Sequence, residues 1–137
     1  MQSVIRVRNL YKLYHLGEET VRALDGVDFE IQKGEFCAIV GTSGSGKSTL
    51  LNMLAGLEKP TKGEVVISGC HLERMNEEQL VSFRRRRVGF IFQAYQLIAS
   101  MDAEENVALP LSFRGMKKSE RTLRARRMLD RVLLGKY

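Results

Sequence analysis

The chain has 137 residues, of which 44% are hydrophobic and 28% are charged, and its net charge is +6. These values are typical of a globular domain and exclude a disordered or fibrous chain. The basic excess lies entirely in residues 84–137, which hold 13 basic and 5 acidic side chains, whereas residues 1–83 hold 9 and 11. Such an excess can serve an anionic partner, although it is more often a solvated helix face.

Three further features restrict where the chain can work. Cys37 and Cys70 lack the spacing of a disulfide framework, which favours reduced thiols. The N-terminus lacks the apolar core of a signal peptide. The longest uncharged stretch late in the chain, residues 88–101, is shorter than the about 20 helical residues that span a bilayer. We therefore expect a chain that does not itself cross a membrane.

The first half of the chain predicts strands around one helix. Apolar and polar residues alternate over 3–14 and again over 24–31, which predicts two half-buried strands joined by a polar connection. The continuous apolar run at 36–40, "FCAIV", predicts a strand buried on both faces. Leucines at helical spacing predict a helix that begins near Gly46, and "VVI" at 65–67 predicts another short strand.

The second half is predicted to be mainly helical. Residues 76–87 should form a helix with Asn76 as its N-cap and acids in its first turn. A second apolar run at 88–92, "VGFIF", predicts a strand. Two more helices are expected over 102–113, with Asp102 as the cap, and over 117–134. The order of strands, mixed elements and then helices indicates an α/β fold.

One glycine-rich stretch predicts a binding function. Residues 41–48, "GTSGSGKS", fit G-x-x-x-x-G-K-[ST] between a predicted strand and a predicted helix. Gly41, Gly44 and Gly46 let the backbone approach a ligand closely in conformations closed to other residues. The N–H groups of such a loop turn inward as a nest for anionic oxygens, and the following helix adds its positive end. The stretch therefore indicates a nucleotide phosphate loop.

The polar side chains of this loop have separate predicted tasks. Lys47 would reach the β- and γ-phosphates of a nucleotide. The Ser48 hydroxyl would ligate Mg²⁺, a cation that prefers oxygen ligands. Thr49 can add a hydroxyl contact deeper in the nest.

The sequence resembles the ATP-binding-cassette ATPases along essentially its whole length. The resemblance rests on "GTSGSGKSTLLNMLAGLEKPTKGEVVISG" and "RRVGFIFQAYQLIASMDAEENVALPL". The sequence of these two stretches is most similar to the branch that serves lipoprotein release, macrolide export and cell division. It implies a P-loop NTPase fold of the cassette type, with an antiparallel β portion and the start of a helical subdomain. It further implies one domain over 1–137, with the β portion and P-loop core at 1–92 and the glutamine loop and helical region at 93–137.

The resemblance also assigns site residues. Tyr14 lies where the family places an aromatic that stacks on adenine, although Tyr11 competes for this role. Gln93 matches the family's loop glutamine, which contacts Mg²⁺ and the attacking water, so Lys47 and Gln93 are the catalytic candidates and Ser48 and Gln93 the metal ligands. The expected contacts to ATP come from Tyr14 and from a run of loop residues: Gly41, Thr42, Ser43, Gly44, Ser45, Gly46, Lys47, Ser48 and Thr49.

Several motifs that the family requires are absent from these 137 residues. There is no "SGG" signature, no apolar run ends in Asp-Glu, and the two histidines, His15 and His71, both lie in the first half. We therefore expect the chain to correspond to the N-terminal portion of a truncated cassette, with the C-terminal part missing. Whether this chain is itself an ATPase stays open, because the expected base and the trans-acting loop are not among its residues.

The function implied by the resemblance is that of the ATP-binding subunit of an ABC transporter. Such a subunit would couple the binding and hydrolysis of Mg-ATP to transport by a separate membrane-spanning subunit. It would work as a dimer of cassettes, peripheral on the cytoplasmic face of the plasma membrane. An alternative is a fragment that binds ATP without hydrolysis. A soluble cassette ATPase acting on nucleic acid or ribosomes is less favoured, and a GTPase or small-molecule kinase least, since no N-K-x-D motif is present.

The basic run Arg84–Arg87 has three possible interpretations. It can be a solvated helix end, a docking face for a transporter's coupling region, or a contact for anionic lipid heads. No aromatic stacking platform accompanies it, so we expect no nucleic-acid partner.

Overall fold

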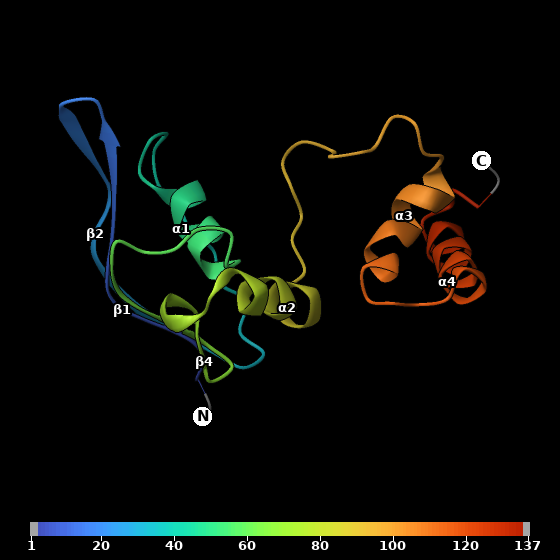
Figure 1. Cartoon of the computed structure of the whole chain (residues 1–137), viewed down its shortest axis with the longest axis horizontal. Helices are drawn as coiled ribbons and strands as arrows, with labels where there is room; N and C mark the ends of the chain where they lie inside the picture. The colour runs from blue at the N-terminus through green and yellow to red at the C-terminus, as the bar shows by residue number, and fades with distance from the viewer. Residues whose placement is uncertain (1–2, 136–137) are drawn as a thin grey trace. The chain divides into compact units, whose positions relative to one another are not determined.

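The computed structural model describes residues 3–135 of the chain, in two compact units, Met1–Gly89 and Phe90–Tyr137 (Figure 1). The first unit holds the sheet and the glycine loop, and the second holds two helices.

The first unit is built on an antiparallel sheet. Its four strands are β1 (Ser3–Leu16), β2 (Glu19–Gln32), β3 (Lys62–Ile67) and β4 (Cys70–His71), in the order β2-β1-β3-β4. The pairing of β1 with β2 runs from Ser3↔Gln32 to Leu16↔Glu19, so the predicted polar connection is itself part of a long hairpin.

The turn of that hairpin explains the difference from the prediction. It is confined to two residues, and Gly17 adopts a positive φ of 64° there. Glycine takes this conformation without steric cost, which lets the strands continue almost to the turn.

Three helical elements cover one side of this sheet and complete the core. They are α1 (Lys47–Leu54), the short 3-10 helix η1 (Leu72–Arg74) and α2 (Glu77–Arg87). Their apolar side chains pack with those of the strands, and this burial is the main stabilising term of the unit. The buried cluster consists of Val7, Leu10, Leu24, Leu50, Met53, Val65, Ile67, Leu72, Leu80 and Phe83.

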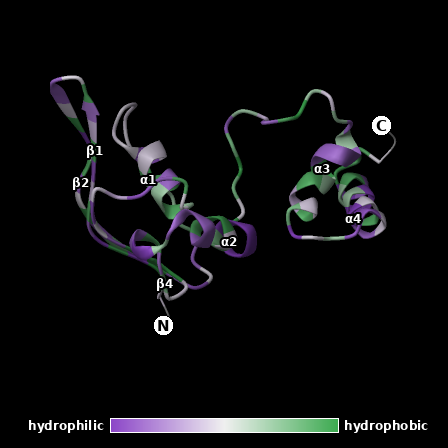
Figure 2. Ribbon diagram, viewed as in Figure 1, coloured by the Kyte–Doolittle hydropathy of each residue, from purple (hydrophilic) through white to green (hydrophobic). Residues whose placement is uncertain are grey.

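The second unit is a pair of helices, α3 (Ala103–Ser112) and α4 (Lys118–Arg131). Ala125 and Leu129 of α4 are buried, and Figure 2 shows that this helix carries both hydrophilic and hydrophobic residues. An ion pair between Arg126 and Glu104 joins the two helices. Part of the apolar surface of α4 is therefore buried, while Leu123 and Met128 stay half exposed.

The predicted helix starts at Asn76 and Asp102 are confirmed in detail. The Asn76 side chain accepts a hydrogen bond from the Gln79 N–H at 2.9 Å, and the Gln79 side chain accepts one from the Asn76 N–H at 2.9 Å. Asp102 and Glu105 form the same reciprocal arrangement at 2.7 and 3.1 Å. These capping boxes satisfy N–H groups that a helix start otherwise leaves without partners.

The predicted strands at 36–40 and 88–92 are wrong for this structure, which has irregular backbone at both. Phe36 is 97% exposed, Val40 is 90% exposed and Ile91 is 97% exposed. A strand of the parallel, doubly buried kind needs a hydrogen-bonding neighbour and covering helices. The strands of the described residues all pair antiparallel in the β2-β1-β3-β4 sheet, which offers these two runs no such neighbour.

Within residues 3–135, no helix combines the length and the apolar character needed to cross a membrane.

Candidate phosphate-binding site

The glycine loop enters α1 through two residues in the left-handed region. Gly44 has φ of 79° and Gly46 has φ of 85°. A Cβ added at Gly46 would lie 2.2 Å from the carbonyl oxygen of Ala23 in β2, whereas one added at Gly44 would meet nothing within 4 Å. Gly46 is therefore required both by its backbone conformation and by the close approach of the loop to β2.

Gly41 and Lys47 close the loop on itself. The Lys47 Nζ donates a hydrogen bond to the Thr42 carbonyl oxygen at 2.6 Å and lies 3.3 Å from the Ser45 Oγ. A Cβ at Gly41 would lie 2.5 Å from that same Ser45 Oγ. The lack of a side chain at Gly41 thus leaves room for the ammonium group and the Ser45 hydroxyl to meet over the loop.

The start of α1 differs electrostatically from the starts of α2 and α3. Its N-cap is Gly46. Among the residues that the structure describes, no side chain forms a capping hydrogen bond at this helix start, and the first turn of α1 holds no acidic residue. α2 and α3 instead carry capping boxes and two glutamates each in their first turns. The positive end of α1 and its first N–H groups are therefore available to an external anion.

Ser48 and Thr49 occupy the first turn of α1. Ser48 is exposed, so its hydroxyl is accessible as an oxygen ligand for a hard cation. Thr49 is half-buried, and it is near enough to Tyr14 to oppose slightly the rise of the Tyr14 pKa that the Glu58 carboxylate causes. The structure therefore brings the predicted base-stacking residue next to the predicted phosphate loop.

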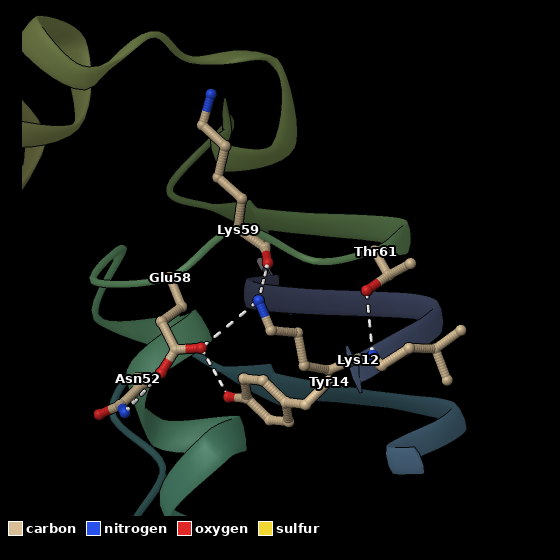
Figure 3. Close-up of polar contacts among 7 residues, drawn as sticks. Lys12, Tyr14, Asn52, Glu58, Lys59 and Thr61 are labelled. Carbon is tan, nitrogen blue, oxygen red and sulfur yellow. Dashed lines mark hydrogen bonds and ion pairs between the residues drawn. The ribbon is translucent and has the colours of Figure 1, made fainter. Parts of the chain in front are cut away.

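A polar cluster of Lys12, Tyr14, Asn52 and Glu58 lies between β1 and α1 (Figure 3). The Tyr14 hydroxyl donates to the Glu58 Oε2 at 2.6 Å, and the Asn52 Nδ2 donates to the Glu58 Oε1 at 3.0 Å. The Lys12 Nζ lies 3.4 Å from the Glu58 Oε2 and donates to the Lys59 carbonyl oxygen at 2.9 Å. Glu58 thus contacts both the strand that carries Tyr14 and the helix that follows the loop.

The pKa directions agree with these contacts. The hydrogen bond from Tyr14 lowers the pKa of Glu58, and this effect outweighs desolvation, which acts in the opposite direction. The hydrogen bond to Glu58 raises the pKa of Tyr14, and desolvation adds to that rise. A neutral phenol donating to an ionised carboxylate is therefore the stable state of the pair.

Sequence reasoning did not select Lys12, Asn52 or Glu58. Glu58 contacts Tyr14 across 44 positions of the chain, and a pattern of local periodicity carries no signal of such a contact.

Gln93 lies in the second unit, in the irregular stretch before α3, where it is exposed. The loop, Tyr14 and Ser48 belong to the first unit. Among residues 3–135, no three His, Cys, Asp or Glu side chains gather in a way that could hold a metal ion. The pairing of Gln93 with Ser48 at a metal ion remains a prediction.

The basic run at the end of α2 divides into two parts. Arg84 donates a hydrogen bond to the Gly56 carbonyl oxygen at 2.5 Å and is half-buried. Arg85, Arg86 and Arg87 are exposed. Arg84 therefore ties α2 to the end of α1, while the other three present their charge to solvent.

Comparison with known proteins gives a family match over most of the chain. A profile described as "ABC transporter" matches residues 24–136. The chain belongs to the ABC transporter family. It is 46% identical, over 98% of its length, to an uncharacterized ABC transporter ATP-binding protein of Thermotoga maritima, and 44% identical, over 94%, to the lipoprotein-releasing system ATP-binding protein LolD of Chromohalobacter salexigens.

The third relative is the macrolide export ATP-binding/permease protein MacB of Hyphomonas neptunium, which is 45% identical over 96% of this chain. The chain spans 58% of the Thermotoga relative, 54% of the LolD relative and 20% of the MacB relative. The predicted resemblance to the lipoprotein-release and macrolide-export branch is thereby confirmed.

Solved structures give the same fold. The chain matches a dimeric structure of the ATP-binding cassette MJ0796 in a post-hydrolysis state bound to ADP and Pi, with a TM-score of 0.86 and 43% identity. The match covers 92% of this chain and 56% of that one. The predicted fold class, a P-loop NTPase of the ABC type of which this chain is a partial cassette, is confirmed.

Proposed function

We propose that the chain forms the nucleotide-binding part of an ABC transporter subunit and that residues 41–49 bind the phosphates of Mg-ATP. The observation that carries this proposal is the closed loop in front of an uncapped helix start, with the Lys47 ammonium held over it. A loop of this kind with a lysine and a following serine suits a polyphosphate and its cation.

Each residue of the proposed site has one task. The N–H groups of the loop and Lys47 bind phosphate oxygens, and the Ser48 hydroxyl holds Mg²⁺, which would supply charge neutralisation at the phosphates. The Tyr14 ring stacks on the base. Gln93, from the proposed glutamine loop and helical region at 93–137, would contact the cation and orient a water molecule. The phosphate site itself lies in the β portion and P-loop core at 1–92.

The proposed partner is a separate membrane-spanning subunit, to which ATP binding and hydrolysis are coupled. The chain would then lie on the cytoplasmic face of the membrane, and a second cassette would pair with it. Three names support this proposal: one relative is part of a lipoprotein-releasing system, one is an ATP-binding/permease protein, and the matching cassette structures are dimeric. The exposed arginines Arg85–Arg87 are a surface on which such a partner could dock.

A second candidate function is ATP binding without hydrolysis. It is favoured by one observation, namely that the 137 residues contain neither an "SGG" triplet nor an apolar run ending in Asp-Glu. Phosphoryl transfer depends on positioned charges and a positioned water, so a chain without those groups would hold ATP unchanged.

The test is a calorimetric titration of the purified chain with MgATP, MgADP and magnesium tripolyphosphate. We expect saturable binding at one site, with tripolyphosphate competing for it. Absence of binding by all three would refute the phosphate site. Phosphate release measured on the same samples separates the two candidates, because only the first permits turnover that depends on Lys47.

A further inference from the structure

We propose that Glu58 is a positioning residue for the nucleotide base: its carboxylate fixes the Tyr14 ring in place and couples that ring to the phosphate loop through Asn52. This inference rests on the proposed function, because it needs a nucleotide at residues 41–49. It concerns the cluster of Lys12, Tyr14, Asn52 and Glu58 shown in Figure 3.

The first step is the constraint on the Tyr14 hydroxyl. It donates to the Glu58 Oε2 at 2.6 Å, a short bond between a phenol and an ionised carboxylate. Charge-assisted bonds of this kind are stronger than neutral ones. A half-buried tyrosine near the end of a hairpin would otherwise sample several orientations, so this bond selects one before any ligand arrives.

The second step is the constraint on the ring. The Lys12 Nζ lies 5.1 Å from the Tyr14 ring centroid and is itself held by Glu58 and by the Lys59 carbonyl oxygen. This is a cation–π arrangement on one side of the ring. Tyr14 is only half-buried, so part of its side chain is accessible for a base to stack on.

The third step links the ring to the loop. Asn52 lies on α1, five residues after Lys47, and donates to the second oxygen of Glu58 at 3.0 Å. Because α1 is a rigid element, Glu58 sets the distance between the Tyr14 ring and the loop from which α1 begins. A bound nucleotide would meet both ends of this arrangement at once.

Tyr11, the competing aromatic, is engaged elsewhere. A Cβ built at Gly26 would lie 2.9 Å from the Tyr11 hydroxyl, which places that ring against β2. The Lys62 Nζ lies 5.6 Å from the Tyr11 ring centroid. Tyr11 therefore packs across the sheet, whereas Tyr14 has the hydrogen-bonded connection to Glu58 and through it to α1.

The experiment compares two probes on the same variants: MgATP, which has a base, and magnesium tripolyphosphate, which has none. Glu58→Ala should weaken MgATP binding by about two- to tenfold, the cost of ordering one side chain. It should leave tripolyphosphate affinity within about twofold. Tyr14→Ala should weaken MgATP by about five- to a hundredfold, the usual range for a lost base–aromatic stack.

Three variants isolate the positioning role. Glu58→Gln keeps an oxygen that can accept from the phenol and should restore most of the MgATP affinity. Glu64→Ala removes a glutamate from an exposed ion pair with Arg74 and should change neither probe. Adding Glu58→Ala to Tyr14→Ala should cause no further loss, because a positioning residue has nothing left to position.

The results distinguish a failure of the inference about Glu58 from a failure of the proposed nucleotide-binding function. If the unmodified chain binds neither probe, the proposed function is refuted and the inference falls with it. If it binds both, and Glu58→Ala weakens them equally, the role of Glu58 is structural and the inference alone is refuted. Unchanged MgATP binding in Tyr14→Ala also refutes the inference, while the phosphate site stands. A melting curve for each variant accompanies the titrations.

Discussion

The Lys47 ammonium lies 2.6 Å from the Thr42 carbonyl oxygen, so the lysine that follows the last loop glycine folds back over the loop. In this position one cation faces the N–H groups and the positive helix end that would bind phosphate. The side chain is thus already placed for an anion before one binds.

Removal of this charge gives the first prediction. A charge-assisted contact contributes about 1.5–3 kcal/mol, so Lys47→Ala should weaken MgATP binding by about ten- to a hundredfold. The measurement is a calorimetric titration. Lys33→Ala is the matched control, because Lys33 is exposed in the turn after β2. Equal MgATP affinities for Lys47→Ala and the unmodified chain would contradict the assignment.

Gly46 gives a prediction about stability. Gly46→Ala would place a Cβ 2.2 Å from the Ala23 carbonyl oxygen in a residue with φ of 85°. We expect a loss of about 1–3 kcal/mol from backbone strain, plus the cost of moving α1 from β2. Gly69→Ala is the matched control, because Gly69 has φ of 78° and nothing within 4 Å of its Cβ position.

Chemical denaturation of the two variants gives the comparison. The control should lose only the cost of the left-handed conformation, about 1–2 kcal/mol. If the two variants lose the same free energy of unfolding, the contact between the loop and β2 does not form in solution.

The parts of the structure that the sequence predicts correctly are those decided by near neighbours. Asn76 and Asp102 each meet a partner three residues later, so their caps follow from local spacing alone. The glycine loop is likewise recognised from its own spacing and from the Lys-Ser pair at its end. The family and its fold were predicted from these local motifs together with the sequences that flank them.

The parts that sequence reasoning misses depend on distant partners. The apolar run at 36–40 predicts a strand only if other strands flank it, and the β2-β1-β3-β4 sheet does not provide them. The contact between Tyr14 and Glu58 joins β1 to the segment after α1, and neither residue type in its own neighbourhood indicates the other. Long-range pairing of this kind is visible only once the fold is known.

The run at 36–40, in which Ile39 packs against the core and the other residues are exposed, gives a third prediction. Phe36 is 97% exposed and Val40 is 90% exposed, so Phe36→Ser and Val40→Thr should each change the free energy of unfolding by no more than about 0.5 kcal/mol. Both should also reduce self-association, because exposed apolar side chains promote it. Denaturation and light scattering measure the two effects.

Val65→Thr is the control for this comparison. Val65 is fully buried in β3, so introducing a hydroxyl there should cost about 1–3 kcal/mol. A comparable loss for Val40→Thr would show that residues 36–40 are packed in solution, as a buried strand would be.

The last prediction concerns the pH dependence of stability at the Tyr14–Glu58 pair. The hydrogen bond from Tyr14 lowers the pKa of Glu58 below its ordinary value of 4.5, despite the opposing desolvation. A carboxylate with a lowered pKa adds stability above its unfolded-state pKa, and this stability is lost as the pH falls through the lower folded-state value. When the pH is lowered beneath about 4.5, the melting temperature should therefore decrease, in part because Glu58 becomes protonated. Tyr14→Phe removes the largest cause of the lowered Glu58 pKa, so its melting temperature should decrease less steeply as the pH becomes acidic.

The melting temperature of Tyr14→Phe should also decrease less steeply at alkaline pH, since the raised pKa of Tyr14 adds stability that is lost as the pH rises above 10.0.

Asn52→Ala is the matched comparison, because the Asn52 hydrogen bond lowers the Glu58 pKa by less than the Tyr14 bond does. The acid dependence of the melting temperature should therefore differ less from that of the unmodified chain in Asn52→Ala than in Tyr14→Phe. The measurement is the melting temperature of the three proteins from about pH 3 to about pH 11, a range that extends beyond the ordinary pKa values of both groups. If the melting temperature of Tyr14→Phe decreased with acid pH as steeply as that of the unmodified chain, the phenol would not be bonded to the Glu58 carboxylate in solution. The positioning role inferred for Glu58 would then lose its physical basis, because the ring would have no charged partner to hold it.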